Sequence, residues 1–60
     1  QKKICLFNGV KMRTTATIGI AVYPNHGRNL HQLYRKAERV VSYCQINDIR
    51  GYAYFDEKMH

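Results

Sequence analysis

Apolar residues are grouped along the chain in segments whose spacing changes from one segment to the next. Residues 4–7 form an uninterrupted apolar run, and from Val10 onward apolar and polar residues alternate, as on a strand with one solvated face. Residues 15–24, TATIGIAVYP, are mostly apolar and rich in β-branched residues, which is typical of an interior strand. Asn8-Gly9 lies between two of these runs and predicts a tight hairpin turn. We therefore expect residues 4–23 to form a β-hairpin that continues into a central strand.

The second arm of this hairpin is expected to be long. The pattern allows one strand from Val10 to Val22, with a change of character near Thr14 where the alternation gives way to apolar residues. Gly19 in its middle has low strand propensity and indicates a bulge or the close approach of another backbone. Pro24 ends the strand, because proline has no N–H to donate to the ladder.

Residues 29–47 have the period of an amphipathic helix. Asn29 occupies the expected N-cap position, and Gln32, three residues later, completes the pattern of a capping box. Arg35, Lys36 and Arg39 fall on the opposite, solvated side together with Glu38. The predicted core face consists of Leu30, Leu33, Tyr34, Ala37, Val40, Val41 and Cys44.

After the helix, Asn47, Asp48 and Gly51 are breakers, and residues 52–56 predict a short aromatic strand. The predicted fold class is thus α+β: a β-hairpin, an amphipathic helix and a final strand. One helix covers only one face of a sheet, so something outside these residues must cover the other face of the central strand. We therefore expect a single partial domain that binds the rest of a larger domain or another copy of itself.

Composition narrows the function classes. A chain of 60 residues buries only a modest core. It has no apolar run long enough for membrane insertion, and four apolar residues after Lys2-Lys3 are too few for a signal peptide, which predicts a cytoplasmic protein. Cys5 and Cys44 are expected to be buried thiols rather than a disulfide. The three histidines have no metal-ligand spacing, so no metal site is predicted.

The formal charge of +6 raises the question of nucleic acid. The basic residues are spread along the chain instead of forming a stripe, which favours a solvated surface. An alternative remains open, in which Tyr23, Tyr52 and Tyr54, with Arg50 nearby, form a stacking surface of a small single-stranded nucleic-acid-binding module.

The strand TATIGIAVYP, the loop after it, the helix with Ala37-Glu38 and the final aromatic strand ending in Asp56 resemble the C-terminal part of the GGDEF domain. In that family a strand of type (T/S)-(V/A)-(S/T)-I-G-(I/V)-A precedes a helix carrying ADxALYxAKxxGRN and a last strand of type VxFYD. The patterns align without a gap from Ala16 to Asp56. The resemblance implies a nucleotidyl-cyclase-like domain with a ferredoxin-like core, from a bacterial protein of cyclic di-GMP signalling.

The family joins two GTP molecules into cyclic di-GMP with metal ions, so Mg²⁺ and GTP are implied for the parent family. Its metal-binding Asp and GGDEF turn lie upstream of the matched region, and no residue of this chain supplies them, so we predict no catalytic residues and no activity for the chain alone. The Lys and Arg that face the triphosphate in the family fall here on Gln45 and Ile49, and the family's Gly falls on Asp48. Arg50 is a weak substitute at best. The resemblance thus implies a degenerate domain with a regulatory or interaction role. The alternative is part of an active diguanylate cyclase with its catalytic half upstream.

Overall fold

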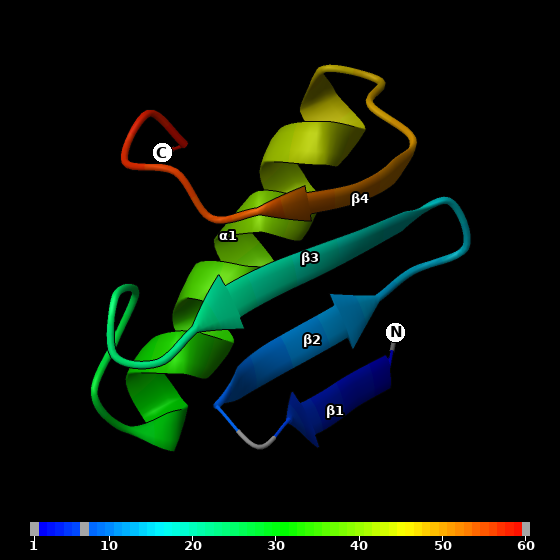
Figure 1. Cartoon of the computed structure of the whole chain (residues 1–60). Helices are drawn as coiled ribbons and strands as arrows, with labels where there is room; N and C mark the ends of the chain where they lie inside the picture. Colours follow the sequence, from blue (N-terminus) through cyan, green and yellow to red (C-terminus); the bar gives the residue numbers. More distant parts are fainter. Residues whose placement is uncertain (1, 7, 60) are drawn as a thin grey trace.

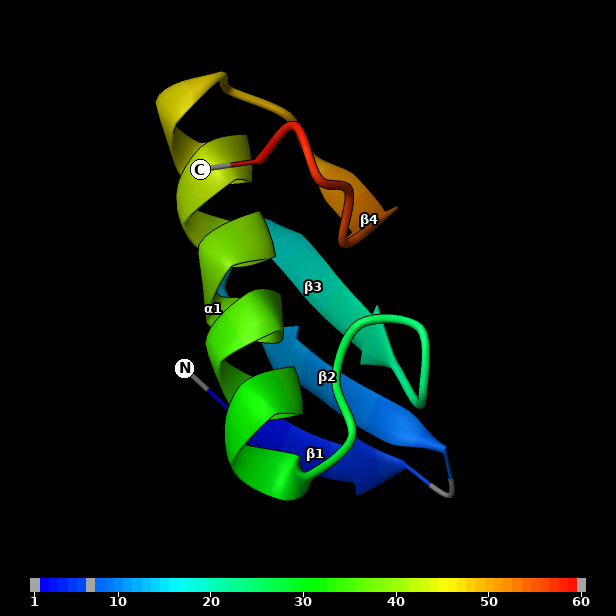
Figure 2. The same ribbon diagram turned by 90° about the vertical axis from the view of Figure 1, so that its left-hand side faces the viewer.

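The structure, a computed structural model, describes the backbone of residues 2–6 and 8–59 and the side chains of residues 8–59. Four strands form one sheet in the order β1-β2-β3-β4, and one helix lies across one face of it (Figures 1 and 2). The elements in chain order are β1 (Lys2–Leu6), β2 (Gly9–Arg13), β3 (Thr17–Val22), α1 (Leu30–Ile46) and β4 (Gly51–Tyr54). The α+β class predicted from the sequence is therefore confirmed.

The predicted long strand from Val10 to Val22 is wrong. The chain reverses at Thr14–Ala16, and β2 and β3 pair antiparallel with Arg13 opposite Ile18. The Thr14 hydroxyl makes this turn, since its Oγ1 accepts hydrogen bonds from the N–H groups of Thr17 at 3.1 Å and Ala16 at 3.4 Å. A threonine side chain that bonds to nearby backbone competes with the strand ladder. The change of character near Thr14 thus marks a turn between two strands.

The first hairpin is confirmed, but its turn is shifted from the predicted position. Gly9 is part of β2, where it pairs with Leu6 on one side and Val22 on the other. The turn therefore does not centre on Asn8-Gly9, and Phe7 lies outside the described residues. A Cβ atom at Gly9 would collide with the carbonyl oxygen of Ala21, so the close approach of β3 requires glycine here.

The helix begins and ends close to the predicted bounds. Asn29 is its N-cap, and the Asn29 Oδ1 accepts a hydrogen bond from the N–H of Gln32 at 2.9 Å, as predicted. Gln32 reaches back one residue further than a standard capping box, because its Oε1 accepts from the N–H of Arg28 at 2.7 Å.

The core lies between α1 and the sheet. Leu33, Ala37 and Val41 pack on β2 and β3, and a second cluster joins Val40, Cys44 and Phe55 beneath β4. Burial raises the pKa of the Cys44 thiol, which is free; the side chain of Cys5 lies outside the described residues. The prediction that Leu30 belongs to the core is wrong. Leu30 is 51% exposed, because the first turn of α1 projects beyond the core.

The last strand runs parallel to β3, with Thr17 opposite Gly51 and Ile20 opposite Tyr54. It begins one residue earlier than predicted and ends at Tyr54 instead of Asp56. Phe55 still donates its N–H to the carbonyl of Ile20 at 2.8 Å, but its side chain turns into the core. The inward side chain of Phe55 continues the alternation along β4.

The C-terminus of α1 is a Schellman motif, with hydrogen bonds from Ile49 N–H to Cys44 O at 2.8 Å and from Asp48 N–H to Gln45 O at 3.4 Å. Asp48 has a φ of 55°, a left-handed conformation that favours glycine. Its negative charge also lies at the helix end where the macrodipole favours cations. Asp48 is thus an unfavourable residue at a position that suits glycine.

We expect Asp48→Gly to raise the free energy of unfolding by about 1 kcal/mol, because it relieves the left-handed strain of a Cβ-bearing residue. Thermal unfolding followed by circular dichroism should show a midpoint about 4–8 °C higher, as expected for a domain this small. Asp48→Ala removes the charge but keeps a Cβ atom. If Asp48→Ala stabilises as much as Asp48→Gly, the effect comes from charge, and the argument from backbone conformation fails.

Candidate functional site

The three positions singled out by the resemblance lie together in the structure. Gln45, Ile49 and Arg50 line a recess of about 210 Å³, which we call the C-terminal recess. Its other wall is the turn between β2 and β3, residues 14–17. Gln45 lies in the last helical turn of α1. The Schellman motif then directs the chain so that residues 49 and 50 lie beside residues 14–17, between β2 and β3.

A partly buried hydrogen bond connects the two walls of this recess. The Thr17 Oγ1 donates to the carbonyl oxygen of Ile49 at 2.9 Å, and Thr17 is only 3% exposed. A second bond, from Gly51 N–H to Ala16 O at 3.0 Å, fixes the start of β4 to the same turn. The backbone of the recess is therefore well held, and its chemistry depends on the side chains at its rim.

Those side chains provide little attraction for phosphate. Gln45 is neutral, Ile49 is apolar, and Arg50 is the only lining cation among the described residues. The Arg50 Nε lies 4.0 Å from Asp48 Oδ1, and both side chains are mostly solvent-exposed. The neighbouring carboxylate offsets the charge of Arg50, so the recess carries no net positive charge for an anion.

Metal ligands are also scarce. Among the residues that the structure describes, no three His, Cys, Asp or Glu side chains lie close enough to hold a metal ion. The His26 Nδ1 is occupied, since it accepts a hydrogen bond from the N–H of Val22 at 2.8 Å. His31 is exposed on the first turn of α1, and His60 lies outside the described residues.

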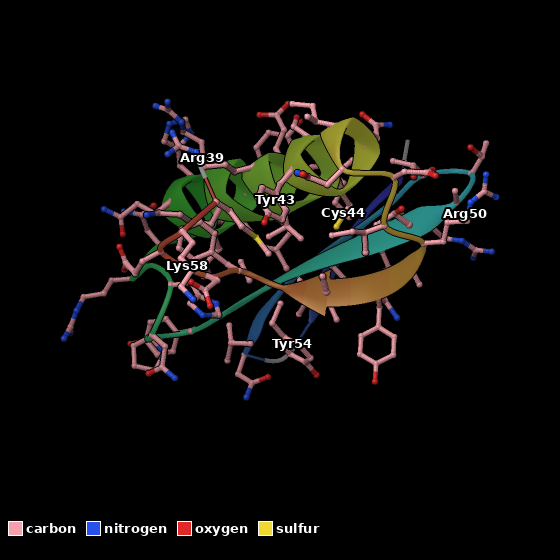
Figure 3. All side chains as sticks on the ribbon, turned by 90° about the horizontal axis from the view of Figure 1, so that it is seen from above. Arg39, Tyr43, Cys44, Arg50, Tyr54 and Lys58 are labelled. Carbon is pink, nitrogen blue, oxygen red and sulfur yellow. The ribbon has the colours of Figure 1, made fainter. Side chains whose placement is uncertain are left out.

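None of the described residues covers the face of the sheet away from α1. Burial alternates along β3, so every second side chain points away from the helix. Figure 2 shows that α1 lies on one side of the sheet. Tyr54 lies on the opposite side of the sheet from α1 in Figure 3, and Tyr52 is 69% exposed. Residues of β2 and β4 that pair with the outward residues of β3 lie on the same surface. We call it the open sheet face: Lys11, Arg13, Ile18, Ile20, Val22, Tyr52 and Tyr54.

Two of the three tyrosines predicted to form a stacking surface are neighbours on this face. The rings of Tyr52 and Tyr54 meet edge to face with centroids 6.3 Å apart. Tyr23 is 47% exposed but follows the end of β3, and Arg50 belongs to the C-terminal recess. The structure therefore brings together only part of the predicted surface, and it adds Lys11 and Arg13 from β2.

A larger recess lies at the other end of α1, where the sequence predicted only a solvated helix face. It has a volume of about 490 Å³ and lies between the loop 24–28 and the first three turns of the helix. We call it the basic recess; its charged or ionisable lining residues are His26, Arg28, Arg35, Lys36 and Arg39. The available sequence signal was the spacing of Arg35, Lys36 and Arg39 on one helix side, with Arg28 just before the helix.

Burial lowers the pKa of His26, and the nearby Lys36 lowers it further, while Glu57 acts in the opposite direction. The imidazole ring packs edge-on against Phe55, with centroids 5.3 Å apart, and its Nδ1 must be unprotonated to accept from Val22. His26 is therefore a neutral, structural histidine that ties the loop after β3 to the core.

We expect the chain to lose stability as the pH falls. Because the folded-state pKa of His26 lies below the unfolded value of about 6.5, the unfolded chain binds the proton first and unfolding becomes easier below about pH 7. Thermal midpoints measured from about pH 7.5 to 5.5 should fall, and His26→Gln should flatten this dependence. His31→Gln, at an exposed position, is the matched control and should keep it. An unchanged slope in His26→Gln would contradict the assignment.

Comparison with known proteins gives one similarity. The chain is 32% identical over 50 residues to the bifunctional diguanylate cyclase/cyclic di-GMP phosphodiesterase MucR of Pseudomonas aeruginosa. The matched segment covers 83% of this chain and 7% of that relative. No protein-family model and no solved structure matches the chain. The similarity is compatible with a GGDEF fragment.

No helix within the described residues is long and apolar enough to cross a membrane.

Proposed function

We propose that this chain is the C-terminal part of a degenerate GGDEF-like domain of a cytoplasmic, cyclic di-GMP signalling protein, with a regulatory or interaction role and no activity of its own. The observation that carries the proposal is the 32% identity over 50 residues to a protein named as a diguanylate cyclase and cyclic di-GMP phosphodiesterase. The open sheet face supports it, because an interior-type strand with one uncovered face suits a segment of a larger domain.

The C-terminal recess supports the inactive form of the proposal. Phosphoryl transfer depends on cations placed to stabilise charge on the phosphate oxygens. By the resemblance, Gln45 and Ile49 fall on the family's cationic positions, and Asp48 adds a carboxylate beside Arg50 in the same recess. Mg²⁺ does not fit this donor set either, since the described residues contain no cluster of three metal ligands. No step of the cyclase reaction is therefore assigned to these residues.

The partner of the open sheet face is the remainder of the same domain or a second copy of the chain. Ile18, Ile20 and Val22 give this face an aliphatic centre, and Tyr52 and Tyr54 give it a partly polar edge. Such a composition is typical of a surface that packs against protein.

A second candidate is a single-stranded nucleic-acid-binding module. It is favoured by one observation, the exposed Tyr52–Tyr54 pair on a face that also carries Lys11 and Arg13. The aliphatic residues between these two groups favour a protein partner, because bases stack on aromatic rings and not on isoleucine. We therefore place this candidate second.

The full reading frame that contains these residues tests the proposal. We expect the full protein to make no cyclic di-GMP from GTP and Mg²⁺, and to bind GTP weakly in isothermal titration. Gln45→Lys together with Ile49→Arg should strengthen GTP binding at least tenfold, because two charge-assisted contacts are restored. Ser42→Lys with Ile46→Arg adds the same charge to the same helix outside the C-terminal recess and should have little effect.

The other outcomes are informative. Cyclic di-GMP production by the unaltered protein would contradict the inactive form and support the alternative, an active diguanylate cyclase with its catalytic half upstream. Salt-dependent binding of a short single-stranded oligonucleotide by the chain, without any response to GTP in the full protein, would contradict the family assignment and favour the second candidate.

A further inference from the structure

We propose that the basic recess binds a small soluble anion that carries phosphate groups. It lies at the opposite end of α1 from the C-terminal recess, and Figure 3 shows Arg39 and Arg50 at opposite ends of the molecule. The proposal therefore concerns a different surface and does not depend on the proposed function.

The charge of the recess is one-sided. Arg28, Arg35, Lys36 and Arg39 line it, and no Asp or Glu is among its described lining residues. Within the described part of the chain, none of these four cations has a carboxylate within 4.0 Å. Glu57 acts on the neighbouring His26 but does not line the recess. Four cationic side chains around one hollow without an acidic partner create a positive potential that favours an anion.

This arrangement is costly for the free protein. Arg35 and Arg39 are one turn apart on α1, a spacing at which like charges repel each other. The first turn of the described helix contains no acidic residue, although the positive end of the helix dipole favours one there. Such local conflicts are expected where function requires them. A bound anion would relieve both conflicts at once.

The donor set favours phosphate. Guanidinium groups bind phosphate oxygens in pairs of parallel hydrogen bonds, and three arginines line the recess. The backbone N–H of Arg28 and that of Gln32 already have side-chain partners, so the ligand would be held mainly by side chains. The volume of about 490 Å³ exceeds what one phosphate needs and suits a phosphorylated small molecule.

Pyrophosphate is the probe for the test. It is titrated into the ¹⁵N-labelled chain at constant ionic strength, and amide shifts are expected at Gly27, Gln32 and Arg35. Thermal unfolding by circular dichroism gives a second readout, because a ligand that binds the folded form raises the midpoint even when the free chain is partly unfolded. Potassium chloride of equal ionic strength is the reference.

Two double variants separate the site from net charge. Arg35→Gln/Arg39→Gln removes two cations from the basic recess, while Lys11→Gln/Arg13→Gln removes two cations from the open sheet face. We expect the first to weaken pyrophosphate binding about tenfold or more, and the second to change it less than about threefold. Equal losses in both variants would mean that only net charge attracts the anion, and would overturn the proposal.

A phosphate group can also belong to a lipid. Co-sedimentation with phosphatidylcholine vesicles that contain phosphatidic acid distinguishes this source from a soluble ligand. Binding to these vesicles without a response to pyrophosphate would overturn the assignment to a soluble anion. The absence of any shift in both the amide spectrum and the thermal midpoint would overturn the site itself.

Discussion

Replacing Gly19 with valine is expected to destabilise the fold strongly. A Cβ atom at Gly19 would lie 2.7 Å from the carbonyl oxygen of Ala37 and 2.9 Å from Val41 Cγ2. The first of these is backbone, so α1 must move away from β3. The helix and strand would then lose the contacts that seat Ala37, Val40 and Val41 in the core.

The expected effect is a substantial fraction of the stability of the chain. Overpacking of this kind costs about 1–3 kcal/mol, and more when backbone must move. A chain of 60 residues is stable by about 3–9 kcal/mol if it follows the usual values per residue. Urea titration followed by circular dichroism should show a much lower unfolding midpoint for Gly19→Val, and a smaller decrease for Gly19→Ala.

Ile20→Val is the matched control, since it is the next residue of β3 and points to the open sheet face. It should change the free energy of unfolding by no more than about 1 kcal/mol. If Gly19→Val unfolds at the same urea concentration as Ile20→Val, the helix is not seated on Gly19 and the packing described above is wrong.

The sequence predicted either a bulge or the close approach of another backbone at Gly19, and the structure shows the close approach. Propensity marks the residue as weak in a strand, but only the position of α1 shows what fills the space. The amphipathic helix and its Asn29 cap could be predicted with more certainty, because both depend on residues close together in sequence. Local signals thus predicted the helix and its cap, and the contact between α1 and β3 decided the role of Gly19.

The two recesses also differ in how far the sequence could predict them. Gln45, Ile49 and Arg50 are close in sequence, so the end of one helix brings them together. The basic recess needs the loop after β3 to fold back beside the helix, which no periodicity predicts. The pattern placed Arg35 and Arg39 correctly on an exposed side. It could not show that this side is concave.

The open sheet face is expected to drive self-association. An isolated chain leaves Ile18, Ile20 and Val22 only half-buried, beside two exposed tyrosines. Pairing two such faces would bury the aliphatic centre of each copy, and completing the burial of each half-buried isoleucine contributes about 1 kcal/mol, roughly half the value for full burial. Analytical ultracentrifugation over at least a tenfold concentration range should therefore show dimers or larger species that grow with concentration.

Ile18→Lys with Ile20→Lys should abolish this association, with a rise of about 100-fold or more in the dissociation constant. Leu30→Lys with Ile46→Lys is the matched control, because it also replaces two partly exposed apolar residues by lysine but lies outside the open sheet face. The control should associate like the unaltered chain. Equal weakening in both would indicate charge repulsion and not a specific face.

A folded monomer at every concentration would contradict the prediction for the isolated chain, and the full reading frame would then decide what covers this face. If the remainder of the same domain covers it, the amides of Ile18 and Ile20 should exchange more slowly with solvent in the full protein than in the isolated chain. If a second copy covers it, protection should depend on protein concentration in both. The hydrogen-exchange rates of two residues thus distinguish a segment that completes a domain from one that assembles with itself.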